Sequence, residues 1–213
     1  MTMKLLIQAL AKFLFGVILI GVLIFLPAGT FSFFRGWLFM GLLFVPMFFA
    51  GLVMMFTNPN LLKSRLNAKE KQRDQSAVIK LSGLMFLAGF IFAGLNFRFD
   101  WFMLPRGVVI GASVVFLAAY ILYAEVLSEN TYLSRTIEVQ DHQKVIDTGL
   151  YAVVRHPMYS ATLLLFLSMP LVLGSIYAFL IFLAYPFIIA KRIKEKKNSW
   201  KKNLKATVNI SKR

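Results

Sequence analysis

Residues 158–190 read MYSATLLLFLSMPLVLGSIYAFLIFLAYPFIIA and contain no charged side chain. About 20 apolar residues are enough for a helix to cross a bilayer, so this stretch is too long for one upright helix. It is interrupted by Pro170, Gly174 and Ser175, residue types that kink or end helices. One tilted helix is the alternative, but a tight helical hairpin accounts better for the break. We therefore predict that the chain enters the membrane and returns within this stretch.

The charged residues outside the apolar segments favour the same arrangement. Residues 191–213 are rich in Lys and Arg, and the loop at residues 57–76 is also strongly basic. Lys and Arg concentrate in the loops on the cytoplasmic side of a membrane. Four upstream spans followed by a hairpin keep both basic segments and both chain ends on that side. We therefore predict cytoplasmic N- and C-termini.

The upstream half of the chain supplies the four spans. Apolar runs long enough to cross a membrane predict helices at residues 5–28, 36–56, 77–95 and 107–125. Thr57-Asn58-Pro59-Asn60 predicts a turn that ends the second span and opens a polar loop. Residues 96–106 predict a short turn on the other side. The first run is longer than the apolar core of a signal peptide, so we expect a retained helix.

The composition sets the class of protein. Of the 213 residues, 59% are hydrophobic and the mean hydropathy is +0.71, well above the roughly 45–50% apolar share of soluble domains. We predict an all-α integral membrane protein with four transmembrane helices plus a C-terminal helical hairpin. It would be a multi-pass protein of the plasma membrane, or of the cytoplasmic membrane if the source is bacterial.

The distribution of charge and the scarcity of metal-ligating residues indicate which binding partners to expect. The formal net charge of +15 lies in the loops and the tail, which suits anionic lipid better than nucleic acid. The chain has no cysteine and two histidines, so we expect neither disulfides nor a metal site. The expected partners are the lipid bilayer and a lipophilic small molecule.

The segment before the long apolar stretch carries the candidate chemistry. Residues 147–160 read DTGLYAVVRHPMYS, so Arg155 and His156 stand between two tyrosines. Pro157 fixes its own φ and biases the preceding residue away from the helical region, so a helix can begin at or just after Pro157. Free backbone N–H groups at such a helix start favour a carboxylate or phosphate. The alternative is a basic helix start anchored by tyrosines at the membrane surface.

The pattern Gly149-x-Tyr151-x-x-x-Arg155-His156-Pro157-x-Tyr159, followed by the apolar stretch and Arg192, resembles the isoprenylcysteine carboxyl methyltransferase family. That family belongs with the membrane phospholipid methyltransferases. The resemblance is specific over roughly residues 125–195. It implies a membrane enzyme that transfers the methyl group of S-adenosylmethionine to a lipophilic or prenylated acceptor.

The resemblance also implies roles for individual residues. Arg155 or Arg192 would orient an acceptor carboxylate and so act as the catalytic residues. It implies a cofactor site formed by Gln143, Lys144, Val145, Ile146, Tyr151, Arg155, His156, Pro157, Tyr159 and Glu195. The chain then divides into N-terminal spans at residues 1–125, a methyltransferase-like core at residues 126–195, and a basic tail at residues 196–213.

The tail departs from the family pattern. The family has an acid four residues after its Arg, but Lys196 stands at that position, and the Gly-Tyr-x-x-Tyr that should follow is missing. Reading the codons one base out of frame from Lys196 can give KEFLEKEFKGYSEYIKK, which contains a Glu-rich helix and the missing Gly-Tyr-x-x-Tyr. We interpret the tail as the product of a one-base frameshift and expect little methyl transfer from the chain as given. The alternative is a native, lipid-binding tail.

Two other classes of function stay open at this point. One is a membrane reductase of similar helical architecture that uses a nicotinamide cofactor. The other is a membrane protein without enzymatic activity, including an inactivated methyltransferase. Cofactor binding separates the three, because they would bind S-adenosylhomocysteine, NADPH or neither.

Overall fold

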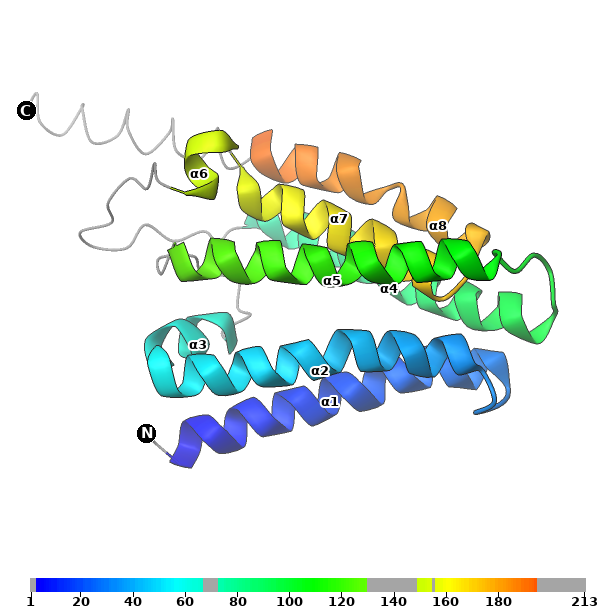
Figure 1. Cartoon of the computed structure of the whole chain (residues 1–213), viewed down its shortest axis with the longest axis horizontal. Helices are drawn as coiled ribbons and strands as arrows, with labels where there is room; N and C mark the ends of the chain where they lie inside the picture. The colour runs from blue at the N-terminus through cyan, green and yellow to red at the C-terminus, as the bar shows by residue number, and fades with distance from the viewer. Residues whose placement is uncertain (1–2, 67–72, 130–148, 155, 195–213) are drawn as a thin grey trace, which may run out of the picture.

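The structure, a computed structural model, is all-α (Figure 1) and describes residues 3–66, 73–129, 149–154 and 156–194. Its helices are α1 (Met3–Ala28), α2 (Phe34–Thr57), α3 (Pro59–Leu66), α4 (Arg73–Arg98), α5 (Arg106–Glu129), α6 (Leu150–Val153), α7 (Pro157–Val172) and α8 (Ile176–Phe182). Five stretches are long and apolar enough to cross a membrane: Met3–Ala28, Phe34–Thr57, Val78–Arg98, Arg106–Glu129 and Ile176–Lys194. The predicted all-α class and multi-pass character are therefore confirmed. The exact pattern of four spans plus a hairpin, and the side on which the termini lie, stay predictions.

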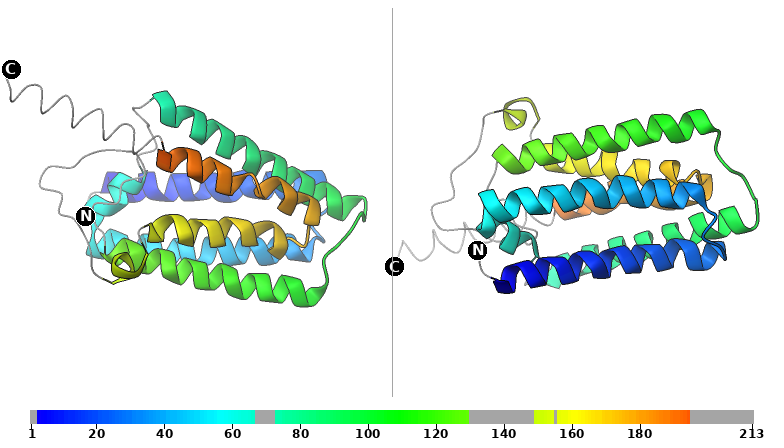
Figure 2. Two further views of the ribbon diagram at one scale, coloured as in Figure 1. Left: turned by 90° about the horizontal axis from the view of Figure 1, so that it is seen from above. Right: turned by 60° about the horizontal axis from the view of Figure 1, so that its bottom comes forward.

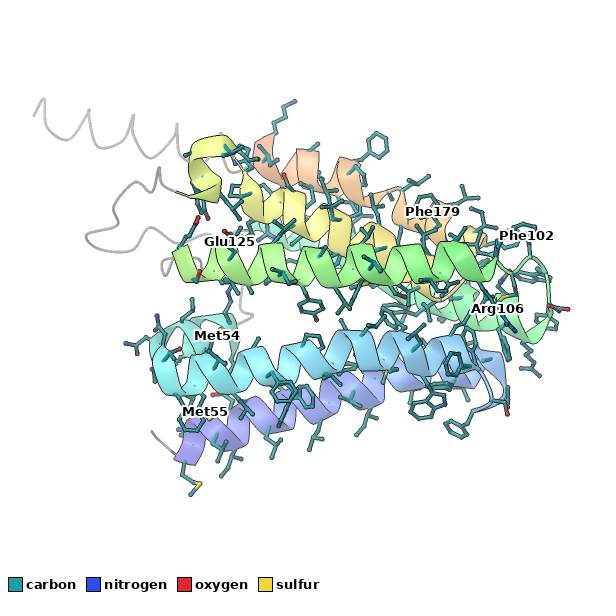
Figure 3. The ribbon with its side chains drawn as sticks, in the orientation of Figure 1. Met54, Met55, Phe102, Arg106, Glu125 and Phe179 are labelled. Carbon is teal, nitrogen blue, oxygen red and sulfur yellow. The ribbon has the colours of Figure 1, made fainter. Side chains whose placement is uncertain are left out.

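The long helices lie alongside one another and leave two different ends (Figures 1 and 2). Helix α1 packs against α2 and α4, α5 packs most extensively against α7, and α8 packs against α4 and α7. One end carries the short helices α3 and α6 together with the N-terminus, and we call it the α3/α6 end. The opposite end carries the α1–α2, α4–α5 and α7–α8 connections. Figure 3 shows Glu125 near the α3/α6 end, and Phe102 and Arg106 at the opposite end.

The second span is followed by a new helix where the sequence predicted a turn and a polar loop. Helix α2 ends at Thr57, and α3 begins at Pro59. The side-chain oxygen of Asn58 accepts the N–H of Leu61 at 3.1 Å, and its carbonyl accepts the N–H of Leu62 at 3.2 Å. Asn at the N-cap and Pro at the first helical position both favour a helix start. The prediction of a polar loop directly after the second span was wrong, because the Asn-Pro pair was interpreted only as the end of a helix.

Helix α4 also runs further than predicted, because Asn96 belongs to it. The Asn96 side chain is fully buried. Its amide donates to the carbonyl of Phe102 at 3.1 Å, and its oxygen accepts the Phe102 N–H at 3.4 Å. The polar residue that suggested a turn therefore lies inside the helix and pairs with the backbone of the turn that follows. The predicted turn at residues 96–106 begins only after Arg98.

The long apolar stretch is interrupted at Gly174 and Ser175, as the sequence predicted, whereas Pro170 lies within α7. Gly174 has a φ of +74°, which favours glycine. The Ser175 hydroxyl accepts the N–H of Ala178 at 3.2 Å and caps α8. The N–H of Leu104 donates to the Gly174 carbonyl at 2.9 Å, which ties this turn to the α4–α5 connection. After α8 the chain becomes helical again at residues 185–194.

Buried aromatic side chains fill the centre of the bundle. Phe39, Phe90, Phe116 and Phe182 are all within 2% of complete burial. The Phe90 ring lies 5.6 Å from the Phe39 ring and 6.0 Å from the Phe182 ring, between centroids. Such offset and edge contacts add to the apolar area that the rings bury. This cluster joins α2, α4, α5 and α8 and holds the helix ends in place around it.

Candidate functional site

The start of α7 has the geometry that the sequence predicts around Pro157. His156 is the N-cap residue, with φ −137° and ψ 61°, and Pro157 occupies the first helical position. The N–H groups of Tyr159 and Ser160 both donate to the His156 carbonyl, at 3.0 and 3.2 Å. Proline has no N–H group of its own. The first turn therefore offers fewer free backbone N–H donors than the sequence suggested. Side chains would have to supply most of the hydrogen bonds to an anion bound here.

Three of the predicted site residues meet at this helix start. The rings of His156 and Tyr159 lie 5.7 Å apart between centroids, and the His156 side chain is exposed. The Tyr159 hydroxyl lies close enough to the side chain of Arg192, near the end of the helical stretch 185–194, for the guanidinium to act on it. The structure thus joins the beginning and the end of the C-terminal apolar region. An imidazole, a phenol and a guanidinium together can bind a carboxylate or a phosphate.

Tyr185 completes this arrangement, and the sequence analysis missed it. Its side chain is 5% exposed and lies beside Thr162. The Thr162 hydroxyl donates to the carbonyl of Tyr159 at 3.0 Å. Tyr185 is also close enough to Tyr159, Arg192 and Tyr123 for their charges to act on it. Helical spacing could have revealed it, since residues 185 and 192 are two turns apart on one face.

Tyr120 and Tyr123, which the sequence placed on one face of a helix, make different contacts. The Tyr120 hydroxyl donates to the carbonyl of Leu43 at 2.8 Å, so this residue joins α5 to α2. Pro46 follows in α2, and a proline leaves a nearby carbonyl without its helical partner. Tyr123 instead lies beneath the guanidinium of Arg65, whose central carbon is 5.7 Å from the ring centroid. Tyr120 is therefore a bundle contact, and Tyr123 faces the α3/α6 end.

Glu129, at the end of α5, holds the segment that leads to the site. Both of its carboxylate oxygens lie 3.2 Å from the N–H of Leu150. Gly149 precedes α6 with a φ of +53°. A β-carbon at Gly149 would lie 1.6 Å from a Glu129 oxygen, so only glycine allows this approach. The half-buried Tyr151 follows in α6. Glu129 gave no signal in the sequence, because its contact spans 21 residues.

The remaining predicted site residues lie outside the described part of the chain. They are Gln143, Lys144, Val145, Ile146, Arg155, Glu195 and the tail at residues 196–213. Their roles stay predictions. Within the described residues, no group of three or more His, Cys, Asp or Glu side chains could hold a metal ion.

Comparison with known proteins points to the region that contains this site. No curated protein and no solved structure matched the chain. The model of the phospholipid methyltransferase family matches residues 106–198, which is less than half of the chain. The match begins with α5 and includes α6, α7 and α8, and therefore His156, Tyr159 and Arg192. This family model does not distinguish the isoprenylcysteine branch that the sequence motif resembles. Residues 106–198 are therefore identified as a region similar to the phospholipid methyltransferase family.

Proposed function

We propose that the protein is a membrane methyltransferase that uses S-adenosylmethionine and methylates a lipophilic acceptor. The observation that carries this proposal is the match of residues 106–198 to the phospholipid methyltransferase family. The meeting of His156, Tyr159 and Arg192 within that region supports it. Within this class we propose carboxyl O-methylation like that of the isoprenylcysteine enzymes, because the motif from Gly149 to Tyr159 resembles theirs.

The described side chains fit one end of the proposed cofactor. S-adenosylmethionine, when bound, supplies a methyl group on a sulfonium, and its amino-acid end carries a carboxylate. Tyr159, which lies beside Arg192, and His156 can donate hydrogen bonds to such a carboxylate. Tyr151 would cover this end of the cofactor from α6.

The chain's task in the reaction is mainly to align the acceptor. A carboxylate acceptor has no proton to lose, so no general base is needed and orientation dominates the rate. Arg155 or Arg192 would hold the acceptor, because a guanidinium offers paired donors that match a carboxylate. Arg192 lies beside the Tyr159 hydroxyl, so an acceptor held by Arg192 would lie next to the side chains proposed to bind the cofactor.

Cofactor binding tests the proposal directly. Titration calorimetry of the purified, frame-restored protein in detergent should detect S-adenosylhomocysteine and not NADPH. His156→Ala should weaken that binding by about 1–3 kcal/mol, the cost of leaving a buried partner unsatisfied. Because His156 is also the N-cap of α7, His156→Asn is the matched variant, since Asn caps a helix but has no imidazole. Binding of NADPH alone would indicate a reductase, and binding of neither would indicate a protein without this enzymatic activity.

The tail can be tested in the same membranes. We expect little methyl transfer from the chain as given and recovery when the alternative reading frame is restored from Lys196 onward. Lysine has only donors and a positive charge, so it cannot replace a carboxylate that accepts hydrogen bonds from the cofactor. Labelled S-adenosylmethionine and a prenylcysteine acceptor give the readout. If both forms transfer methyl groups equally fast, the frameshift interpretation is wrong and the basic tail is native.

We also propose that the α3/α6 end faces the cytoplasm. Lys63, Arg65, Lys191, Arg192 and Lys194 all belong to this end of the described chain, and Lys and Arg concentrate on the cytoplasmic side. A reporter fused after the last residue should be active only inside the cell. Activity outside the cell would contradict both this orientation and the paired crossing of α7 and α8.

A further inference from the structure

The guanidinium of Arg65 lies at the α3/α6 end with unused hydrogen-bond donors. The side chain is half-buried, and its central carbon stands 5.7 Å from the centroid of the Tyr123 ring. Its Nε and Nη2 atoms are buried, and neither has a hydrogen-bond partner among the described residues. Buried donors without acceptors are costly, so such a pair calls for an explanation.

These two atoms form one edge of the guanidinium. The N–H groups on that edge point in parallel and match the two oxygens of a carboxylate or a phosphate. A guanidinium that stacks on an aromatic ring does so with its face, and such stacking does not use the N–H groups on its edge. Arg65 is therefore arranged to receive a planar or tetrahedral anion from the side.

Helix α3 holds Arg65 in this position. Asn58 caps the helix at one end, and the Nζ of Lys12 donates to the carbonyl of Leu66 at the other. Leu61 and Leu62 are 6% and 5% exposed. Arg65 follows them by four and three residues, so it shares their inward face. The guanidinium is thus turned toward the bundle by the same packing that anchors the helix.

Tyr123 connects Arg65 to the site described above. Tyr185 lies close enough to Tyr123, Tyr159 and Arg192 for their charges to act on it. Two guanidiniums, those of Arg65 and Arg192, therefore flank one group of tyrosines. Of the two carboxylates near the end of α5, Glu129 binds the N–H of Leu150 and Glu125 is exposed to solvent.

We propose that Arg65 binds the anionic head group of the methyl acceptor, a carboxylate or phosphate attached to an apolar chain. This inference rests on the proposed function for the meaning of "acceptor", but the binding site itself does not depend on methyl transfer. The apolar part of the ligand would lie along the membrane-spanning helices, and its head would reach the Nε and Nη2 edge. Arg65 lies outside residues 106–198 and so outside the family match.

The test compares charged and uncharged forms of one ligand. The probes are an S-farnesylcysteine with a free carboxylate, its methyl ester, and a lysophosphatidic acid, each titrated into the full chain in detergent. The variants are Arg65→Gln, Arg65→Lys and, as a control, Lys63→Gln. Lys63 is an exposed cation on the same helix. Binding of S-adenosylhomocysteine is measured separately with every variant.

The wild-type protein should bind a charged probe at least about tenfold more tightly than the methyl ester, the size of one charge-assisted hydrogen bond. Arg65→Gln should remove that preference and leave the affinities for the ester and for S-adenosylhomocysteine unchanged. Arg65→Lys should keep part of the preference for the charged probe, because lysine keeps the charge but not the paired donors. Lys63→Gln should change nothing. The charged probe that loses affinity in Arg65→Gln identifies the head group as a carboxylate or a phosphate.

Two results would overturn the proposal. One is an unchanged preference for the charged probes in Arg65→Gln. The other is an equal loss of all probes together with a lowered melting temperature, which would make Arg65 a structural residue that only packs on Tyr123. Failure of the proposed function has a different signature: the frame-restored protein would then bind no S-adenosylhomocysteine, whatever the Arg65 variants do.

Discussion

The contact between Glu129 and Gly149 offers a sharp test of how the site segment is held. Glu129 binds the N–H of Leu150 through both carboxylate oxygens, at 3.2 Å each. Gly149 lets this approach happen, with a φ of +53° and a ψ of −128°. The residues that follow lead directly to His156 and α7. Gly149→Ala should therefore release the segment without touching any predicted site side chain.

The size of the effect follows from two separate costs. The new β-carbon would lie 1.6 Å from a Glu129 oxygen and 2.4 Å from the carbon that bears it, so the carboxylate must leave. Losing a hydrogen bond to a charged group costs about 1.5–3 kcal/mol. Holding a non-glycine residue at positive φ costs roughly a further 1–2 kcal/mol. Because these costs overlap when the segment moves, about 3 kcal/mol is a reasonable total, which corresponds to roughly a hundredfold larger open population.

Hydrogen exchange followed by mass spectrometry can measure that population. In Gly149→Ala, the peptide that covers residues 149–154 should exchange roughly a hundredfold faster, while peptides from α4 and α5 stay protected. Glu129→Gln should act in the same direction by less, about tenfold, because a neutral amide oxygen still accepts a hydrogen bond but a weaker one. Glu125→Gln is the matched control, since Glu125 lies one turn earlier and is exposed. It should leave the exchange unchanged.

The reasoning fails if Gly149→Ala and Glu129→Gln both exchange like the wild type. It also fails if Glu125→Gln accelerates the segment as much as Glu129→Gln, since a general loss of negative charge would then be responsible. Faster exchange in every peptide would mean that the substitution unfolds the bundle, and the segment would have to be examined through Glu129→Gln alone.

Two further predictions concern the packing of the spans. Gly94→Ala should lower the melting temperature in detergent, because its β-carbon would lie 2.5 Å from the backbone oxygen of Ile24, and overpacking of this kind costs about 1–3 kcal/mol. Gly83→Ala in the same helix meets nothing within 4 Å and should be neutral or slightly stabilising. Tyr120→Phe should cost about 0.5–1.5 kcal/mol in denaturant unfolding, because it removes the hydrogen bond to the Leu43 carbonyl; an unchanged midpoint would show that this bond contributes nothing.

The sequence predicts the long helices well because their cause is local. An apolar run of sufficient length must be helical inside a bilayer, where no water satisfies the backbone. The helix start at Pro157 and the interruption at Gly174 are also local, since each depends on the backbone of one or two residues. These features needed no knowledge of which helix packs against which.

What the sequence could not predict depends on which partner a polar side chain meets in the folded protein. Asn96 looked like a turn residue until the structure showed its amide on the backbone of Phe102. Glu129 looked like the acidic end of a span, but it binds the start of α6. Tyr185 looked like one more apolar residue, although it joins Thr162 beside the predicted site. Periodicity shows which face a residue occupies, but not what lies opposite that face.

The two proposals assign two different tasks to residues at the α3/α6 end. The residues proposed to hold the cofactor, His156 and Tyr159, lie within the region that matches the phospholipid methyltransferase family. The residue proposed to select the acceptor, Arg65, comes from a short helix outside that region. Cofactor binding requires the same donors whatever is methylated, whereas the acceptor head group differs between a lipid amine and an acid. If Arg65 binds the head group of the acceptor, substitution of Arg65 in α3 should alter which head group is bound and leave S-adenosylhomocysteine binding intact.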